Sequence, residues 1–177
     1  VDKGLHYDEL SDYFGVTPRT IKAWSDNYGV KVKRKTNRKN FFDFDFFKTI
    51  DSEAKAYILG FVTADGYIDM EGKSLNITLA KKDEEMLKII AKELKFTGNI
   101  RKEVRERVTI SFCCKEMVED LSAYGVVQNK TKTVFIPELE EGLTRHFLRG
   151  YFDGDGYIGD HQAVLVTSSE KFDKQLL

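Results

Sequence analysis

Two aspartates of the chain stand in the same short setting, 90 residues apart. Asp65 and Asp155 each end a largely apolar run, and each is followed by the residues Gly-Tyr-Ile. Aspartate is seldom buried in a protein core, and glycine is a poor helix former. A single apolar run that ends in this way would be an oddity, but its repetition indicates two related units with a shared role.

The two strings, YILGFVTADGYI (57–68) and HFLRGYFDGDGYI (146–158), predict two helices that pack side by side. Residues without bulky side chains allow two helix backbones to approach closely. We expect the helix contact to be formed by four such residues: Gly60, Ala64, Gly150 and Gly154. This contact would bring Asp65 and Asp155 together at the ends of their helices.

Two neighbouring carboxylates repel each other unless a cation lies between them. Mg²⁺ prefers oxygen ligands of this kind, and water and a substrate phosphate usually complete its shell. A paired site of this type can polarise a phosphate ester and activate water against it. Asp65 and Asp155 therefore predict a Mg²⁺ site suited to phosphodiester hydrolysis.

Each string is followed by alternating strand patterns and then by helical periodicity. The first string opens an α-β-β-α-β-β-α unit within residues 51–125, and residues 126–143 connect it to a second unit at 144–177. The second unit contains one hairpin and the opening of a helix, so we expect it to be incomplete. The first residue is Val1, so we also expect the chain to be a processed or recombinant fragment.

The strand alternation of the first unit predicts antiparallel sheets with one face packed on helices. Met70 and Val104 are among the residues expected on the packed face. The opposite face carries side chains suited to base edges and phosphates, namely Tyr67, Asn76, Thr78, Arg101, Arg105 and Arg107. A two-stranded ribbon fits the DNA major groove, whereas a plainly solvated face is the alternative explanation.

Residues 1–30 predict a separate all-α module of the helix-turn-helix type. Thr17 is a suitable cap and Pro18 a suitable first residue for a recognition helix over 17–27. We expect Ile21 and Trp24 to face inward. The outward side chains expected to contact DNA are Arg19, Thr20 and Lys22. A helical hairpin that contacts another protein is the alternative.

A basic and aromatic segment at residues 31–50 links this module to the first unit. Six of the ten residues in KVKRKTNRKN (31–40) are basic, and residues 1–40 carry nine basic against five acidic side chains, a balance of +4. We expect an arm that follows DNA phosphates or lies in the minor groove. Its candidate contacts are Lys33, Arg34, Lys35 and Arg38. A solvated linker is the alternative.

The overall composition excludes several classes of protein. The apolar fraction is 41%, the charged fraction is 32%, and no apolar run reaches the roughly 20 residues that span a bilayer. Cys113 and Cys114 are adjacent, which favours a reducing compartment, so we expect a cytoplasmic protein with no membrane partner. His6, His146 and His161 lack cysteine pairs at zinc-ligand spacing, which disfavours nucleases with a metal finger.

The doubled string resembles the LAGLIDADG motif of homing endonucleases, in the two-motif single-chain form, and the likeness covers about residues 41–177. The resemblance implies an α+β fold with αββαββα repeats, the first complete and the second truncated, whose sheets straddle the major groove of double-stranded DNA. It implies that Asp65 and Asp155 bind Mg²⁺ and cut both strands across the minor groove. It also implies an assisting lysine, for which Lys130 is the candidate and Lys81 a weaker one.

The chain departs from the motif at two places. Thr63 stands where the earlier aspartate of the first motif would be, whereas the second motif keeps Asp153. Arg149 replaces a small residue of the second motif, so it must point away from the helix contact or loosen it.

Two other functions fit the same fold: a DNA-binding regulator without activity, and an intron maturase that binds RNA. Retention of both motif aspartates favours the nuclease. We expect the incomplete second unit to be completed by a missing C-terminal segment, a complementing chain or a second copy. The resemblance implies that the protein acts inside the host cell of a mobile element, which would be an intron, an intein or a phage.

Overall fold

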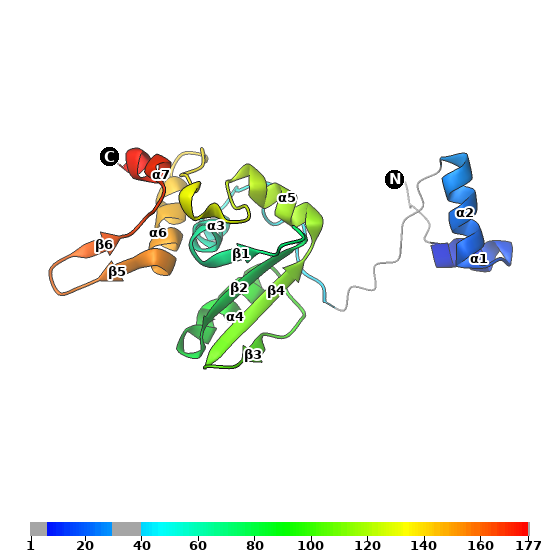
Figure 1. Ribbon diagram of the computed structural model, residues 1–177, viewed down its shortest axis with the longest axis horizontal. Helices are drawn as coiled ribbons and strands as arrows, with labels where there is room; N and C mark the ends of the chain where they lie inside the picture. Colours follow the sequence, from blue (N-terminus) through cyan, green and yellow to red (C-terminus); the bar gives the residue numbers. More distant parts are fainter. Residues whose placement is uncertain (1–6, 30–39, 177) are drawn as a thin grey trace. The chain divides into compact units, whose positions relative to one another are not determined.

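The computed structural model describes residues 7–29 and 40–176 (Figure 1). The chain divides into two compact units, Val1–Lys39 and Asn40–Leu177, and each is described by itself. Across the described ranges no helix combines the length and the apolar character needed to cross a membrane. The elements are α1 (Tyr7–Phe14), α2 (Pro18–Tyr28), α3 (Glu53–Asp65), β1 (Gly66–Ile68), β2 (Ser74–Ala80), η1 (Lys81–Asp83), α4 (Glu84–Glu93), β3 (Arg101–Glu103), β4 (Arg107–Cys113), α5 (Lys115–Ala123), η2 (Lys130–Lys132), α6 (Thr144–Asp155), β5 (Gly156–Ile158), β6 (Ala163–Leu165) and α7 (Glu170–Leu176).

In the N-terminal unit, Val1–Lys39, a tight turn joins α1 and α2. Thr17 caps α2, since its Oγ1 accepts a hydrogen bond from the backbone N–H of Thr20 at 3.3 Å. Ile21 is buried as predicted, but the prediction for Trp24 was wrong, because this side chain is 42% exposed. Its ring packs edge-on against Phe14 at 6.1 Å. Two short helices provide too little apolar surface to enclose an indole ring as well.

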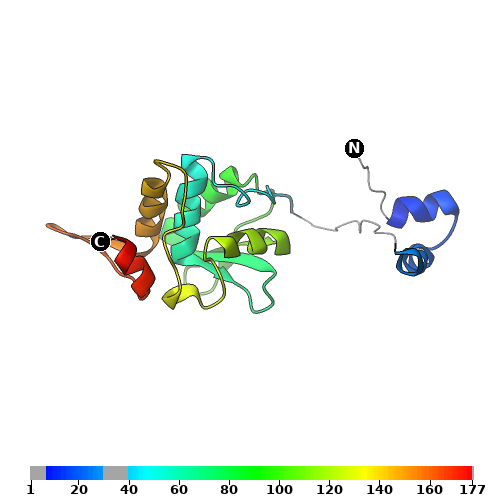
Figure 2. The ribbon, with the colours of Figure 1, turned by 90° about the horizontal axis from the view of Figure 1, so that it is seen from above.

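The core of the C-terminal unit, Asn40–Leu177, is built around α3. Ser52 caps this helix by accepting a hydrogen bond from the backbone N–H of Lys55, and a continuous run of side chains from Ile58 to Thr63 is buried. A helix that is apolar on all sides lies inside a protein. Figure 2 shows α3 (teal) lying alongside α6 (orange-brown), so the two repeated strings do form neighbouring helices.

The first repeat carries a four-stranded antiparallel sheet in the order β1-β2-β4-β3 (Figure 1). Its core face is buried, as the sequence predicts, through Leu75, Ile77, Val108, Ile110 and Phe112. Helices α4 and α5 contact the central strands. Mixed helices and antiparallel sheets confirm the predicted α+β class.

Met70 and Val104 do not lie on the core face, contrary to the strand alternation. They are 84% and 83% exposed, because β1 and β3 each end after three residues and the chain turns there. In the first turn Asp69 Oδ1 accepts a hydrogen bond from the backbone N–H of Lys73 at 2.7 Å. A side-chain acceptor of this kind closes a turn earlier than the apolar pattern indicates.

The second repeat shows a two-stranded sheet, β5 and β6, followed by α7. Phe172 buries α7 against the core, and the Ser169 hydroxyl donates to the carbonyl of Val134 at 2.6 Å. The exposed fractions of equivalent residues differ sharply between the repeats, since Ile68 is 3% exposed and Ile158 is 72% exposed. In the first repeat, β2 and β4 extend the sheet and the face of Ile68 is covered. In the described part of the second repeat, the equivalent face around Ile158 is open.

Candidate functional site

The reciprocal contact between α3 and α6 positions the two aspartates. A Cβ added to Gly60 would lie 1.9 Å from the carbonyl oxygen of Phe147, and one added to Gly150 would lie 1.9 Å from that of Tyr57. Any side chain at either glycine would therefore push the helices apart. Since α3 ends at Asp65 and α6 ends at Asp155, the contact aligns their last turns.

The last turns of the two helices touch at the predicted site. A Cβ on Gly154 would lie 2.4 Å from the Cβ of Ala64 and 3.2 Å from Oδ2 of Asp65. The pKa of Asp65 is raised to about 6, first by burial and then by the negative charge of Asp155, while the charge of Lys130 opposes the shift. Asp65 is half-buried and Asp155 is exposed. The two carboxylates are thus close enough to interact, but they differ in surroundings.

Lys130 is the third charged group at this point. Its ammonium group donates hydrogen bonds to the carbonyl oxygens of Gly66 and Ala64, at 2.5 and 3.3 Å. Burial lowers the pKa of Lys130, whereas the charges of Asp155 and Asp65 work in the opposite direction. The residue begins η2 in the connector between the repeats. The charge of Lys130 therefore acts on both carboxylates, from a position where the carbonyls at the end of α3 favour a cation.

Lys81, the weaker candidate, has a different setting. Its ammonium group forms an ion pair with Glu106 at 3.0 Å, at the turn between β3 and β4. Asp83, at the other end of the short helix η1 that Lys81 begins, contributes to the raised pKa of Asp65 through its negative charge.

A pocket with a volume of about 270 Å³ opens beside Asp155. Its lining includes Lys130 and Asp155 together with Thr63, Tyr151 and Thr167. Sequence reasoning did not single out Tyr151 or Thr167. The signal was present, because position 151 is tyrosine where the equivalent position of the first string, Phe61, lacks the hydroxyl group.

The departures from the motif lie outside the contact between the glycines. The Tyr57 hydroxyl donates to Asp153 Oδ2 at 2.7 Å, a hydrogen bond that joins the two repeats. The Arg149 guanidinium lies over the Tyr57 ring, 4.8 Å from its centroid, so it covers the edge of the helix pair. Thr63 is buried and satisfies its hydroxyl on the carbonyl of Leu59 at 2.8 Å.

The outward face of the four-stranded sheet carries an ordered row of polar side chains. Tyr67 pairs with Asn76, and Asn76 pairs with Ser111 across the strands. Arg101 Nη2 donates to Ser111 Oγ at 2.8 Å, and Ser111 Oγ donates to Asn76 Oδ1 at 2.6 Å.

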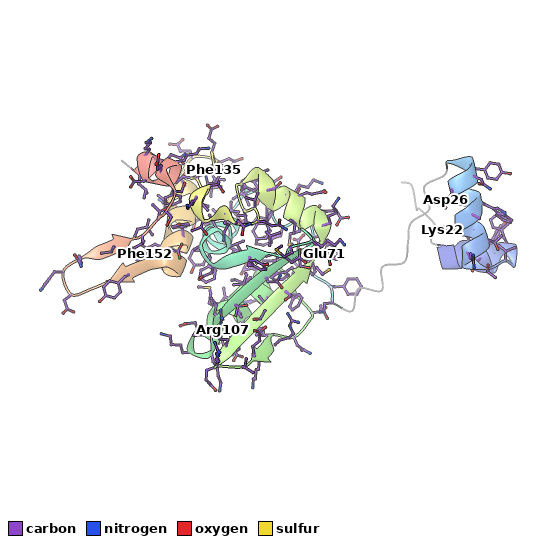
Figure 3. The ribbon with its side chains drawn as sticks, in the orientation of Figure 1. Lys22, Asp26, Glu71, Arg107, Phe135 and Phe152 are labelled. Atoms are coloured by element: carbon purple, nitrogen blue, oxygen red, sulfur yellow. The ribbon has the colours of Figure 1, made fainter. Side chains whose placement is uncertain are left out.

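The remaining sheet candidates have mixed settings. Thr78 is half-buried and shares a hydrogen bond of 2.7 Å with Thr109, which is 3% exposed although the alternation puts it on the outward face. Arg107 is exposed at the start of β4 (Figure 3). Arg105 lies in the preceding turn with φ of 61°, so it stands at the end of the sheet rather than on its face.

The other DNA-contact candidates belong to the N-terminal unit. Arg19 and Lys22 are exposed on α2, where Lys22 and Asp26 stand one turn apart (Figure 3). Thr20 is half-buried and shares a 3.0 Å hydrogen bond with Thr17. The basic-arm candidates lie outside the described residues: Lys33, Arg34, Lys35 and Arg38.

The side chains around Asp65 and Asp155 match the ligand preferences of the predicted Mg²⁺ ion only in part. Within residues 7–29 and 40–176 there is no group of three or more His, Cys, Asp or Glu side chains that could together hold a metal ion. Mg²⁺ is commonly held by one or two carboxylates, with water and substrate phosphates as its other ligands. The interaction that raises the pKa of Asp65 beside Asp155 is one that a cation would relieve. The two aspartates therefore fit such an ion.

Comparisons with known proteins give the family. Replication factor C small subunit of Methanocaldococcus jannaschii is 31% identical over 133 residues, which are 71% of this chain and 7% of that protein. The Thermococcus kodakarensis protein of the same description is 28% identical over 123 residues, or 67% of this chain and 14% of that protein. The chain thus spans only a small part of either relative.

A solved structure, the I-LtrWI LAGLIDADG homing endonuclease bound to target DNA, superposes with a TM-score of 0.40 and 13% identity, covering 59% of this chain and 58% of that one. The family model described as a LAGLIDADG-like domain matches residues 52–122 and 143–177, which contain both repeated strings and more than half of the chain. The chain therefore belongs to the LAGLIDADG-like domain family.

Proposed function

We propose that this protein is a site-specific endonuclease that cuts both strands of double-stranded DNA by Mg²⁺-dependent hydrolysis, as a homing endonuclease does. The observation that supports it is the approach of Asp65 and Asp155 at the ends of α3 and α6, beside Lys130. Two carboxylates held together in this way are costly without a cation. Because the chain belongs to the LAGLIDADG-like domain family, a phosphodiester is the substrate that we propose for these carboxylates.

Asp65 and Asp155 would hold the divalent ion, one from each repeat. When bound, the ion would supply positive charge against the scissile phosphate and lower the pKa of water. Lys130 keeps a positive charge beside both carboxylates and is anchored on the carbonyls of Ala64 and Gly66. It would place that charge against the phosphate oxygens of the minor-groove edge, which stabilises the developing negative charge.

The sheet would orient the duplex through its outward face. Arg101 is held by Ser111, and Ser111 by Asn76, so the guanidinium group is directed before DNA arrives. Prearranged side chains lose less conformational entropy on binding. We propose that this face enters the major groove, with Tyr67, Thr78 and Arg107 as its other contacts.

The N-terminal unit would add a second DNA contact. We propose that α2 enters a groove through Arg19 and Lys22, and that the basic arm follows the phosphates. The open face of β5 and β6, where Ile158 is 72% exposed, is the place where further strands would be added. A complementing chain and a second copy are two proposed sources of these strands.

The test is cleavage of a plasmid library with randomised inserts, at matched Mg²⁺ and Ca²⁺ concentrations. The wild-type chain and a C-terminally extended form should be compared with Asp65→Asn and Asp155→Asn. We expect the variants to bind the selected DNA but to lose linear product by at least about 100-fold. Binding without cleavage by the extended form, with any divalent ion, would favour the regulator over the nuclease.

A matched control shows whether a loss of cleavage is specific to the predicted pair of carboxylates. Asp69→Asn removes a carboxylate from the neighbouring turn, outside the predicted pair, and should leave cleavage within about threefold. If cleavage persists when both Asp65 and Asp155 are replaced, the assignment of the site is wrong. RNA tested in parallel distinguishes the maturase, because an intron-binding protein would prefer folded RNA to duplex DNA.

A further inference from the structure

Helix α7 of the second repeat holds the connector between the repeats. The Gln175 side chain bonds to both backbone groups of Ile136: its oxygen accepts from the N–H at 2.9 Å, and its amide donates to the carbonyl at 2.9 Å. One turn earlier on α7, the Lys171 ammonium group lies 3.9 Å from the centroid of the Phe135 ring (Figure 3). A side chain that satisfies both backbone groups of a residue restrains that residue as strand pairing would.

A buried hydroxyl group extends this contact to Lys130. Ser169, the residue before α7, is 1% exposed, and its hydroxyl donates to the carbonyl oxygen of Val134 at 2.6 Å. The backbone N–H of Val134 in turn donates to the carbonyl oxygen of Lys130 at 3.0 Å, at the end of η2. Val134 therefore joins the second repeat to the backbone of Lys130 through two hydrogen bonds.

The side chain of Lys130 reaches the other repeat. Its ammonium group donates to the carbonyl oxygens of Ala64 and Gly66, where α3 ends. Two residues before it, the Gln128 side-chain amide donates to the carbonyl of Asp69 in the turn after β1. A lysine ammonium group stands on a flexible stem, so its position depends on where the backbone is held. For Lys130 that backbone support comes partly from the second repeat.

We propose that Ser169 and Gln175 are positioning residues, which hold Lys130 against the end of α3 through the connector. The second repeat thereby sets the place of a charge that acts at the end of the first repeat's motif helix. The inference rests on the proposed nuclease function for its effect on cutting, whereas the placement of the Lys130 side chain is independent of that function.

The alternative is a purely structural role for the two residues. Helix α7 also packs on the core through Phe172, whose ring stacks on Tyr151 with 4.4 Å between the centroids. If Ser169 and Gln175 only strengthened this packing, their loss would loosen the C-terminal unit in general. A positioning role instead affects Lys130 more than other residues, and the experiment uses this difference.

The experiment compares Ser169→Ala and Gln175→Ala with a matched control for each. Ser122→Ala also removes a hydroxyl that donates to a backbone carbonyl at 2.6 Å, but this residue lies on α5. Lys174→Ala shortens the side chain next to Gln175, where Lys174 pairs with Glu170 of the same helix at 3.9 Å. Gln175 is exposed, so water replaces its hydrogen bonds and this variant tests the proposal even if Ser169→Ala fails to fold.

The first readout is the rate at which an amine-reactive ester labels Lys130, without DNA or divalent ions, measured by peptide mass spectrometry. Lys130 is half-buried and held by two carbonyl groups, so the wild-type rate should be low. Ser169→Ala and Gln175→Ala should each raise it about threefold or more through local opening, and the controls should not. Lys55, which is also partly buried and donates to the carbonyl of Thr49 at 3.0 Å, is the internal reference.

Two results of this labelling would overturn the proposal. One is an unchanged rate at Lys130 in the folded variants. The other is an increase of equal size at Lys55, because general loosening of the unit exposes both side chains.

The second readout is the single-turnover cleavage rate at saturating DNA. Ser169→Ala and Gln175→Ala should each lower the rate about tenfold, because a displaced charge no longer faces the reacting phosphate. The Kd for DNA in Ca²⁺ should change by less than about twofold, since binding rests mainly on other contacts. The control variants should keep both the rate and the Kd of the wild type.

The same substitutions are then made together with Lys130→Ala. There they should lower the rate by less than about twofold, because residues that act through one group have non-additive effects. Equal losses with and without Lys130 would overturn the proposal, since a structural role gives additive effects. If the wild-type protein cuts no DNA, the proposed function fails, and the labelling of Lys130 alone decides whether α7 positions this residue.

Discussion

Gly60 and Gly150 face each other's helix backbone in a reciprocal contact between α3 and α6. A Cβ on either residue would lie 1.9 Å from a carbonyl oxygen of the opposite helix. No side chain can move aside to relieve such a clash, because the obstacle is backbone. The same contact brings the ends of the two helices together, so one feature determines both the stability of the repeat pair and the approach of Asp65 to Asp155.

Replacement of Gly60 by alanine should therefore destabilise the protein by about 3 kcal/mol, since overpacking against backbone forces the helices apart. Urea unfolding followed by circular dichroism measures this loss. The control is Gly72→Asn, because Gly72 has open space around its Cβ position and a left-handed backbone with φ of 64°, which asparagine tolerates. Equal losses in both variants would show that the helix contact is looser than the structure indicates.

The pKa of Asp65 makes a signed contribution to stability. Its pKa is raised to about 6 in the folded state from 3.8, so between these values the folded state binds more protons and stability falls as pH rises. Above pH 6 the full cost is present, about 1–2 kcal/mol once solvent screening of a half-buried group is allowed for. Asp65→Asn removes this cost.

Urea unfolding of the wild-type and Asp65→Asn chains from pH 4 to pH 7, without divalent ions, checks the sign. The free energy of unfolding of the variant relative to wild type should increase across this range. A difference that is constant with pH would mean that Asp65 titrates normally. Asp69→Asn serves as a control for an acid group in the turn that follows. The free energy of unfolding of this variant relative to wild type should not increase with pH in the same way.

Divalent ions should stabilise the folded protein, because a ligand that binds only the folded state adds RT ln(1 + [L]/Kd). At 100 times the Kd the gain is about 2.7 kcal/mol. Differential scanning calorimetry with Mg²⁺ or Ca²⁺, reversed by a chelator, measures the effect. The rise in Tm should be absent in Asp65→Asn and Asp155→Asn. A rise of equal size in these variants would place the ion elsewhere.

The sheet face makes a prediction about DNA affinity. Arg101→Ala should weaken binding to the selected DNA by about 1–3 kcal/mol if the guanidinium group reads a base, and should relax specificity at that base. If Arg101 contacts a phosphate, the salt dependence should instead decrease by about one unit of slope. Lys88→Ala on α4, where Lys88 pairs with Glu85 at 3.1 Å, is the control.

Much of the fold was predictable because it depends on local periodicity. The α-β-β-α-β-β-α order, the buried strand face and the helix caps at Thr17 and Ser52 all follow from residues close together in sequence. The errors at Met70 and Val104 came from strand ends, where turn chemistry overrides alternation. Trp24 was misplaced because burial depends on how many layers surround a helix, and local sequence does not contain that number.

The sequence by itself determined which residues could do chemistry, because a repeated string points to Asp65 and Asp155 without any coordinates. Only the tertiary structure decided how these residues are surrounded. Asp65 becomes half-buried at the helix contact, Asp155 stays exposed at the edge of a pocket, and the charge of Lys130 in the connector acts on both. Burial and charge proximity are properties of residues distant in sequence, so the inequality of two identical motif aspartates arises only when the chain folds.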